Sequence, residues 1–529
     1  MRRKPNERVL MTSSRANTAL DSPGLNRTVP RYAGLKYLGI AVVIACGAVL
    51  RLWNLGYSDY QGDEIKALYR PDPGQGLWSF LLDQRKGPVQ FVTTYFVHFF
   101  DRDYSSELLE RLPFAIAGVV SLWFFYRFVA MHFDDRVALL ATGLYATNGM
   151  IVALSRLAQY QAMMMLFTAL ALYFFSKALF EERYRLSGWL LGAAAWAVGV
   201  LAHFDGMLIL PFVLYIAIQY FLKYKTVRPI VLSGVLFSVM VLAFYGPYGL
   251  ALSHSTVNYW EDRFSGDPDA LQSSAFLFKI YNPLYTYPLY IVLTALGVFC
   301  LAWAFWKRRD WLRNTFLLLW LLGVVIFFEV VMSEPGTHIL NYQIPLTILM
   351  AFGVSSVLDF LGGLDFSAGK VLKAVGSVSA AAVFAFLVVQ SYAVYVDHTR
   401  EYPYQSEKLL GRELPKVDPD EGYELRIFGF PYNRGWQDIR EYVSTDATKR
   451  IYATNDKDSI AVFYMSPNED GDRDEIGYFV WVNDPQSFDS ERPTGRVARW
   501  MKTHEPNLTI DRRGKVASEV YKIPESWGQ

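Results

Sequence analysis

The chain has 529 residues, of which 52% are hydrophobic, 16% are aromatic and only 19% are charged. A soluble protein of this length could not cover its surface with so few polar groups, so the composition predicts a polytopic membrane protein. The formal net charge of +1 leaves no basic excess to neutralise phosphates, and we expect no nucleic-acid partner. Cys46 and Cys300 both lie inside apolar runs, which indicates neither a disulfide framework nor a thiolate metal site.

Residues 1–33 are polar and rich in Arg and Ser, and we interpret them as a disordered cytoplasmic tail. Residues 34–396 are predicted to form a transmembrane domain, because apolar runs close to the roughly 20 residues that cross a bilayer recur along them. About eleven spanning helices are expected. Their approximate bounds are residues 38–52, 113–131, 137–154, 162–180, 187–201, 207–222, 229–245, 285–306, 316–332, 339–360 and 371–395.

The stretch GPVQFVTTYFVHFF, residues 87–100, could be a twelfth span, but it is short and contains several polar residues. We interpret it as an interfacial or re-entrant helix within a first outer loop, residues 53–112. The connections HFDDR, EERYR, LKYKTVR, KRRDWLR and LDFSAGK then all face the cytoplasm, in agreement with the positive-inside rule. The sequence therefore predicts a multi-pass protein of the cell membrane, inner or plasma, with a cytoplasmic N-terminus and residues 397–529 outside.

Charged residues, Pro, Gly, Asp and Asn become frequent after the last apolar run. The likely strands of this region, YELRIFGF and EIGYFVWV, alternate with the helix-like segments GWQDIREYV and SERPTGRVARWMKTH. The predicted fold class is thus an α-helical polytopic membrane protein with a soluble, extracytoplasmic α/β domain at residues 397–529.

Ionisable and aromatic side chains gather in the connections expected outside. Charged groups at a membrane edge are costly, so such a cluster indicates a functional site. The candidates are Tyr60, Asp63, Glu64, Arg85, Lys86 and Arg111 in the first outer loop, Arg156 and Tyr160 in SRLAQYQ, His203 and Asp205 in LAHFDG, and His338 and Tyr342 in THILNYQIP.

The adjacent carboxylates of Asp63 and Glu64 point in different directions on a loop. One could act on a reacting hydroxyl while the other orients it or binds a partner. A solvated pair that caps the helix starting near Ile65 explains the same residues without any chemistry. The residues alone leave both interpretations open.

The basic candidates also have two interpretations. Arg85 and Lys86 precede a Gly–Pro breaker, where they could bind a phosphate or ordinary anionic headgroups. Arg111 and Arg156 stand at the ends of apolar helices, where an arginine commonly only extends to the interface.

The remaining candidates could bind substrate. His203 and Asp205 could be metal ligands or acid–base groups, but two groups are too few for a metal site. An interface histidine with ordinary hydrogen bonds is the alternative. Tyr60 could stack on a sugar ring.

The order of motifs carries a resemblance. A D–E pair in the first outer loop is followed by RKGPVQF, ERLPFAIAG, FDDRVALLATGLYATNGMIVALSRLAQYQ and a late HILNYQIP. In this order the chain resembles the integral-membrane glycosyltransferases of the GT-C superfamily, which include protein O-mannosyltransferases and lipid A aminoarabinose transferases. The resemblance covers roughly the first 400 residues, and the α/β tail is similar to that of the bacterial aminoarabinose type.

The resemblance implies transfer of a sugar, with inversion, from a polyprenyl phosphate to a protein, lipid or glycan hydroxyl outside the membrane. Asp63 would be the catalytic base and Glu64 its partner. The expected ligands of the donor phosphate are Arg85, Lys86, Arg111, Arg156 and His338, and the expected substrate contacts are Tyr60, Tyr160, His203, Asp205 and Tyr342. RKGP departs from the family in having one proline, and the last motif, which carries a lysine in aminoarabinose relatives, has His338 and no lysine here.

The chemistry of a sugar phosphoester fits this expectation. Such a donor already carries its leaving group, so the enzyme needs a base and cations rather than a nucleotide-binding loop. No cofactor is required, although a divalent cation could bind at Asp63 and Glu64. The alternative function is a transporter or flippase, in which Glu329 would be the main buried charge.

Overall fold

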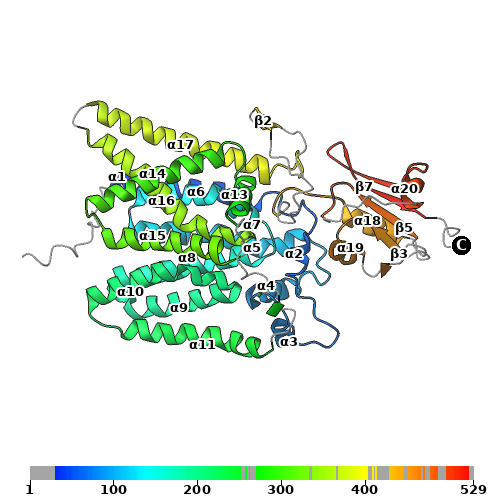
Figure 1. Ribbon diagram of the computed structural model, residues 1–529, viewed down its shortest axis with the longest axis horizontal. Coiled ribbons are helices and arrows are strands. Elements are labelled where there is room, and N and C mark those ends of the chain that lie inside the picture. Colours follow the sequence, from blue (N-terminus) through cyan, green and yellow to red (C-terminus); the bar gives the residue numbers. More distant parts are fainter. Residues whose placement is uncertain are drawn as a thin grey trace, which may run out of the picture.

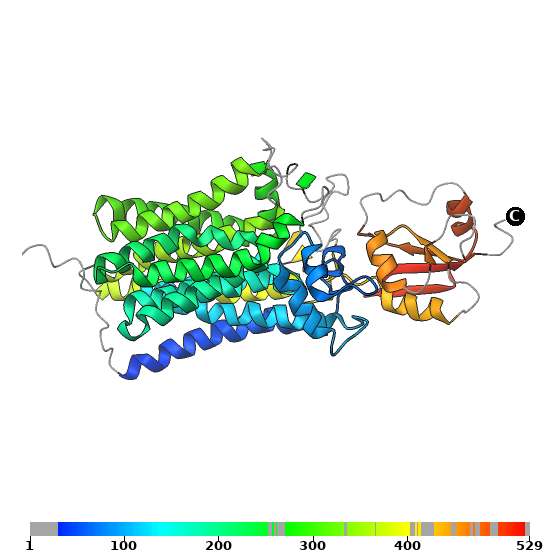
Figure 2. The same ribbon diagram turned by 90° about the horizontal axis from the view of Figure 1, so that it is seen from below.

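The computed structural model describes residues 30–251, 257–258, 261, 270–332, 336–364, 367–402, 408–409, 411–413, 428–445, 451–465, 469–470, 477–486 and 496–523. Long helices run side by side in one bundle, and a small sheet with its own helices lies beyond one end of that bundle (Figures 1 and 2). The sequence predicts the tail at residues 1–33. Its residues 1–29 lie outside the described residues, and helix α1 (Pro30–Leu52) begins three residues before the expected end of the tail.

Nine helical stretches of the described chain are long and apolar enough to cross a membrane. They are Glu107–His132, Tyr160–Phe180, Glu182–Ala202, Phe204–Tyr224, Arg228–Leu250, Thr286–Trp306, Trp311–Val331, Gly336–Gly362 and Gly369–Tyr395. Each corresponds to one of the eleven expected spans. They contain helices α5 (Glu107–His132), α8 (Tyr160–Phe180), α9 (Arg185–Ala202), α10 (Leu210–Tyr224), α11 (Arg228–Leu250), α14 (Thr286–Trp306), α15 (Trp311–Ile326), α16 (Gln343–Gly362) and α17 (Ser367–Tyr395).

The other two expected spans differ from these nine. The apolar part of α1, Tyr37–Leu52, is shorter. The stretch 137–154 is divided at Asn148 into α6 (Asp135–Thr147) and α7 (Gly149–Leu154). The Asn148 carboxamide oxygen accepts the N–H groups of Met150 and Ile151 and so caps α7. A Cβ on Gly149 would lie 1.6 Å from the carbonyl oxygen of Tyr281 in α13 (Ala270–Tyr281), so the close approach requires glycine.

The stretch expected at the membrane surface forms the ten-residue helix α4 (Pro88–Val97). Ten residues extend about 15 Å, half of what the hydrocarbon core requires, which agrees with the interfacial interpretation. Pro88 occupies the first turn, where its missing N–H costs nothing. Helices α2 (Gly62–Ile65), α3 (Leu77–Leu82) and α4 all lie at the end of the bundle nearest the sheet (Figure 1).

The C-terminal sheet has five strands in the order β4-β3-β5-β7-β6. Strand β3 (Ile451–Thr454) pairs in parallel with β4 (Glu469–Asp470) and β5 (Tyr478–Val482), whereas β7 (Lys515–Lys522) is antiparallel to β5 and β6 (Leu508–Arg512). Helices α18 (Trp436–Ser444), α19 (Asp458–Met465) and α20 (Arg496–Met501) accompany it. A separate pair, β1 (Lys408–Leu409) and β2 (Arg412–Glu413), follows α17.

The structure confirms the expected fold class, a helical polytopic protein with a small α/β region at its C-terminus. The segment EIGYFVWV contains β5, and GWQDIREYV contains α18, whose single apolar face buries Trp436, Ile439 and Val443. The predicted strand YELRIFGF is not confirmed. Its residues 423–427 lie outside the described chain, and residues 428–430 form a turn.

The loop after α1 packs directly against the C-terminal region. Tyr60 and Ile65 belong to the apolar core of the sheet and its helices. The N–H of Asp59 donates to the carbonyl of Tyr432 at 3.0 Å, and the N–H of Tyr60 donates to the Tyr464 hydroxyl at 2.8 Å. These contacts place α2 between the bundle and the sheet.

Candidate active site between the bundle and the sheet

Glu64 is held inside the protein. Its side chain is fully buried and accepts two parallel hydrogen bonds from Arg111, at 2.8 Å from Nε and 2.7 Å from Nη2. The N–H groups of Ala158 and Gln61 donate to the same carboxylate, and the Gln61 contact closes a capping box at the start of α2. Glu64 therefore stabilises α2 and its contact with α5, and its carboxylate is not directed at a substrate.

Arg111 also forms hydrogen bonds that hold this loop in place. Its Nη1 donates to the carbonyls of Leu55 and Ser58, and its Nη2 donates to the carbonyl of Asp59 as well as to Glu64. Together with Nε, these bonds use all five N–H donors that a guanidinium offers. The expectation that Arg111 binds the donor phosphate is therefore wrong for this arrangement, because no donor remains for it.

Arg156 has a comparable structural position at the end of α1. Its guanidinium donates to four backbone carbonyls, those of Leu50, Arg51, Trp53 and Asn54. Leu50 and Arg51 are among the last four residues of α1, whose carbonyls a helix leaves without intrahelical partners, and Trp53 and Asn54 follow directly, so Arg156 helps to cap α1. Its expected role as a phosphate ligand stays a prediction, and the geometry adds a structural role at the end of α1.

Asp63, in contrast to the buried Glu64, keeps 30% of its side chain exposed. Its carboxylate lies 3.6 Å from the Nζ atom of Lys86 and 3.8 Å from that of Lys66. The positive charge of Lys86 is the main reason that the pKa of Asp63 is lowered, since it outweighs the opposing effect of burial. Asp63 is thus an ionised, accessible carboxylate beside a cation.

Lys86 links Asp63 to a second group of side chains. Its ammonium lies 5.5 Å from the centre of the Tyr160 ring, and that ring stacks on His203 at 4.1 Å. The backbone explains this approach, because a Cβ on Gly87 would lie 2.1 Å from the carbonyl oxygen of Leu201 at the end of α9. Arg85, the neighbouring basic residue, is exposed.

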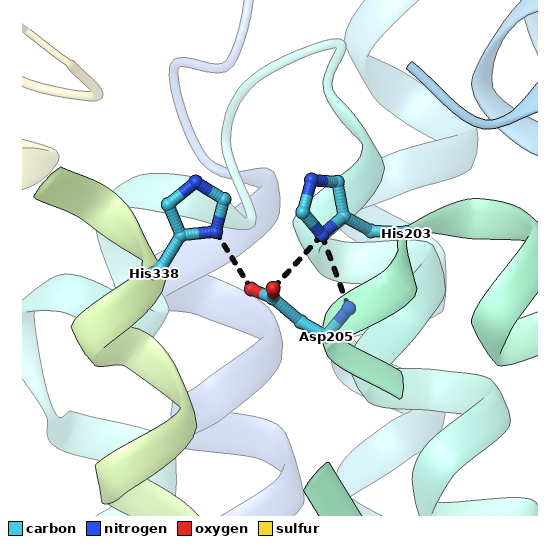
Figure 3. A group of neighbouring side chains, drawn as sticks. All are labelled: His203, Asp205 and His338. Atoms are coloured by element: carbon cyan, nitrogen blue, oxygen red, sulfur yellow. Dashed lines mark hydrogen bonds and ion pairs between the residues drawn. The ribbon is translucent and has the colours of Figure 1, made fainter. Parts of the chain in front are cut away.

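His203, Asp205 and His338 form a buried cluster (Figure 3). His203 ends α9, Asp205 lies in the short helix η2 (Phe204–Ile209), and His338 lies in η4 (Gly336–Tyr342). Nδ1 of His338 is 2.8 Å from Oδ2 of Asp205, and Nδ1 of His203 is 3.1 Å from Oδ1. Asn341 also donates to Oδ2, at 2.8 Å.

Two expected substrate contacts lie elsewhere. Tyr60 is fully buried in the core of the C-terminal region, so its ring is not available to stack on a sugar. Tyr342 donates its hydroxyl to Glu329 in η3 (Phe327–Val331). Glu329 is the main buried charge in favour of a transporter. Because it accepts this hydrogen bond, its carboxylate is less strong evidence for a transport pathway. Asp63, Lys86, Tyr160, His203, Asp205 and His338, in contrast, form one connected chain of contacts.

The sequence analysis missed the residues that hold this site in place. Asp59 accepts the N–H of Arg434 at 2.5 Å, and Arg434 in turn pairs with Glu401 at 2.8 Å. Asp59 and Arg434 are 375 positions apart in the chain. No local pattern in the sequence could indicate such a contact, because neither residue lies in a recognisable motif.

Comparisons with known proteins agree with this fold. The profile of the family described as dolichyl-phosphate-mannose-protein mannosyltransferase matches residues 89–245. An undecaprenyl phosphate-alpha-4-amino-4-deoxy-L-arabinose arabinosyl transferase of Pseudomonas paraeruginosa is 28% identical over 273 residues, which cover 48% of this chain and 47% of that protein. The transferase of the same name from Pectobacterium carotovorum is 27% identical over 239 residues, 42% of this chain and 41% of that one. The chain thus spans about half the length of the curated relatives it matches.

A solved structure extends the likeness to nearly the whole chain. The crystal structure of ArnT from Cupriavidus metallidurans bound to undecaprenyl phosphate aligns with a TM-score of 0.55 and 11% sequence identity, over 92% of this chain and 98% of that one. At this identity the match shows a shared fold. The family profile, the curated relatives and the shared fold agree with the apolar helices, and over these regions the chain is similar to polytopic membrane glycosyltransferases of the GT-C type.

Proposed function

We propose that this protein transfers a sugar from a polyprenyl-phosphate donor to an acceptor hydroxyl, with inversion and with Asp63 as the general base. The observation that carries the proposal is the contrast between two neighbouring carboxylates. The Glu64 carboxylate forms a buried ion pair with Arg111, whereas the Asp63 carboxylate is partly exposed and kept ionised by Lys86. The names of the curated relatives support a polyprenyl-phosphate donor.

The residues suit each part of this reaction. The acceptor oxygen attacks the anomeric carbon of the sugar while its proton passes to the Asp63 carboxylate. The bond between that carbon and the phosphate oxygen breaks, and the polyprenyl phosphate leaves with the electron pair. Lys86 stabilises the negative charge that develops on the departing phosphate. Because the acceptor attacks opposite to the leaving group, the anomeric configuration inverts.

The location of the site matches the substrate. A polyprenyl lipid stays in the bilayer, so its phosphate must be met at the membrane edge. Asp63 lies in α2, which is at the end of the bundle nearest the C-terminal sheet (Figure 1), and Lys86 lies within 3.6 Å of its carboxylate. We propose that this end faces outward in the cell membrane and that the C-terminal region, residues 397–529, guides a protein, lipid or glycan acceptor.

The experiment that tests the base is Asp63→Asn in full-length protein reconstituted into liposomes, with transfer measured from a set of radiolabelled polyprenyl-phosphate sugars. Loss of a general base should reduce the rate by roughly 10²–10⁴-fold. Asp83→Asn, which changes an exposed carboxylate of the same loop, should leave the rate unchanged.

Transfer by Asp63→Asn at the wild-type rate would remove Asp63 from the mechanism. If wild-type protein transfers no sugar from any donor but moves a labelled lipid-linked sugar across the bilayer, the transporter alternative is correct.

A further inference from the structure

We propose that His203, Asp205 and His338 bind a divalent cation of the zinc type, and that this cation together with Lys86 binds the phosphate of the donor. The first half concerns the metal alone. The second half rests on the proposed glycosyltransferase function.

The three side chains already have the spacing of a metal site. One candidate ligand atom from each residue lies within 4.8 Å of the other two. In a tetrahedral zinc site with bonds of about 2.0–2.1 Å, ligand atoms are about 3.4 Å apart. The contacts of 2.8 Å and 3.1 Å between the two imidazoles and Asp205 are close to that separation, so small side-chain movements would complete the site.

An unsatisfied atom points to a missing ligand. Oδ1 of Asp205 is buried and has no hydrogen-bond donor among the described residues. Nδ1 of His203 lies 3.1 Å from this oxygen, but the same nitrogen accepts the backbone N–H of Asp205 at 3.3 Å, so it acts as an acceptor and not as a donor to Oδ1 (Figure 3). Leaving a buried carboxylate oxygen without a partner is costly, and a cation between Oδ1 and the imidazoles would remove that cost.

The surroundings are those of a functional metal site. Asn341 donates to Oδ2 of Asp205, as second-layer partners do when they orient a ligand carboxylate. Two imidazoles and one carboxylate favour zinc or a similar transition metal over magnesium or calcium. Three protein ligands leave a fourth position open, which is the pattern of sites that bind a substrate.

The position of the cluster supplies the link to the donor. Tyr160 stacks on His203 at 4.1 Å, and the ammonium of Lys86 lies 5.5 Å from the centre of the same ring. A cation here would add to the charge of Lys86, and the two would stabilise a departing phosphate from neighbouring positions. It also differs from the site expected at Asp63 and Glu64, where the Glu64 carboxylate is already paired with Arg111.

The first test measures metal content and needs no turnover. Full-length protein, purified without a polyhistidine tag and stripped with a chelator, is incubated with zinc and analysed by mass spectrometry, and separately with cobalt for its visible absorption. We expect about one metal per chain and the absorption bands of tetrahedral cobalt. Asp205→Asn and the double variant His203→Ala/His338→Ala should lose both signals, whereas His504→Ala, which changes an exposed histidine, should retain them.

Asn341→Ala provides a graded test. If Asn341 orients Asp205 toward a metal, its loss should weaken zinc binding by about 10–100-fold while the cobalt spectrum keeps its tetrahedral form at saturation. Wild-type protein that binds no more metal than the double variant, with all proteins showing the same melting temperature, would overturn the site and leave the cluster as a buried hydrogen-bonded group.

The second test addresses the phosphate. Binding of an undecaprenyl phosphate without a sugar is measured in the stripped and the zinc-loaded protein, and we expect zinc to tighten it at least tenfold. Equal affinities would overturn the contact with the donor but not the metal site. Zinc binding and sugar transfer by the wild-type protein separate this inference from the proposed function. Intact zinc binding with no transfer from any donor would contradict only the proposed function, whereas intact transfer without zinc binding would contradict only the metal site.

Discussion

Asp63 and Glu64 occupy adjacent positions, yet their environments differ in every respect that matters for chemistry. Glu64 accepts donors from Arg111, Ala158 and Gln61, so no lone pair is directed at a substrate. Asp63 forms ion pairs with the lysine side chains of Lys66 and Lys86 and remains partly exposed. At the scale of single residues, therefore, one carboxylate is a structural element and the other is suited to accept a proton.

The Asp63–Lys86 pair predicts a pH dependence. The lowered pKa of Asp63 keeps it deprotonated at neutral pH, so a base at this position loses activity only as the pH falls through that lowered value. Lys86→Gln removes the main cause of the lowering, and the acid limb of the kcat/KM profile should move to higher pH. The loss of the cation should also reduce kcat by about 10²–10³-fold.

Lys66→Gln is the matched control. Lys66 is also an ion-pair partner of Asp63, but 59% of its side chain is exposed, so solvent screens its charge. Its removal should move the acid limb less than that of Lys86. Equal profiles for wild type and Lys86→Gln would show that Asp63 is not the titrating base.

At the scale of elements, α2 and α5 are joined by a charged pair rather than by apolar packing. The guanidinium of Arg111 fills the space between the α2 carboxylate and three loop carbonyls. Arg156 likewise donates to the backbone carbonyls of Trp53 and Asn54, just after the end of α1. These two arginines shape the loop on which Asp63 is carried.

Arg111→Met should destabilise the protein strongly. The substitution keeps the volume but leaves the Glu64 carboxylate buried without its cation, which costs about 3–5 kcal/mol. Thermal unfolding of the purified protein in detergent measures this loss. Combining it with Glu64→Gln should recover part of the stability, because the buried charge is then absent. If the double variant is less stable than Arg111→Met, the buried charge is not the cause.

At the scale of the whole molecule, the loop before α2 joins the bundle to the C-terminal region. Burial raises the pKa of Asp59 to about 7, even though the Arg434 N–H bonds its carboxylate. The folded protein therefore binds this proton more tightly than the unfolded chain, whose Asp59 has the ordinary pKa of 3.8. Its stabilising effect is fully present below that ordinary value and is lost as the pH rises through about 7.

Asp59→Asn should flatten this dependence. An uncharged carboxamide can still accept the Arg434 N–H but does not titrate, so the melting temperature should fall less between pH 5 and pH 8 than in the wild type. The slope that is removed is at most about 1.4 kcal/mol per pH unit. Asp72→Asn, at an exposed position of the same loop, is the control. Identical slopes for wild type and Asp59→Asn would contradict the assignment.

Local patterns in the sequence determined much of this protein. The bilayer requires continuous apolar helices, so nine of the expected spans appear directly as hydrophobic runs. The short helix α4 could be predicted from the sequence, because polar residues interrupt its apolar run. The break at Asn148 could not, because it depends on a contact with Tyr281 in another helix. The sequence also indicated which region would carry the ionisable cluster.

Tertiary structure alone decided how that cluster is divided. Arg111 meets Glu64 across 47 positions, and His338 meets Asp205 across 133. A side chain's role depends on whether its charge is already neutralised by a partner, and such partners are chosen by packing between distant segments. The sequence by itself determined a multi-pass helical fold with acidic and basic groups at one end of its helices. Only the packing separated the framework pair, Glu64 and Arg111, from Asp63, Lys86 and the histidine–aspartate cluster, because burial and geometry decide which charges stay available.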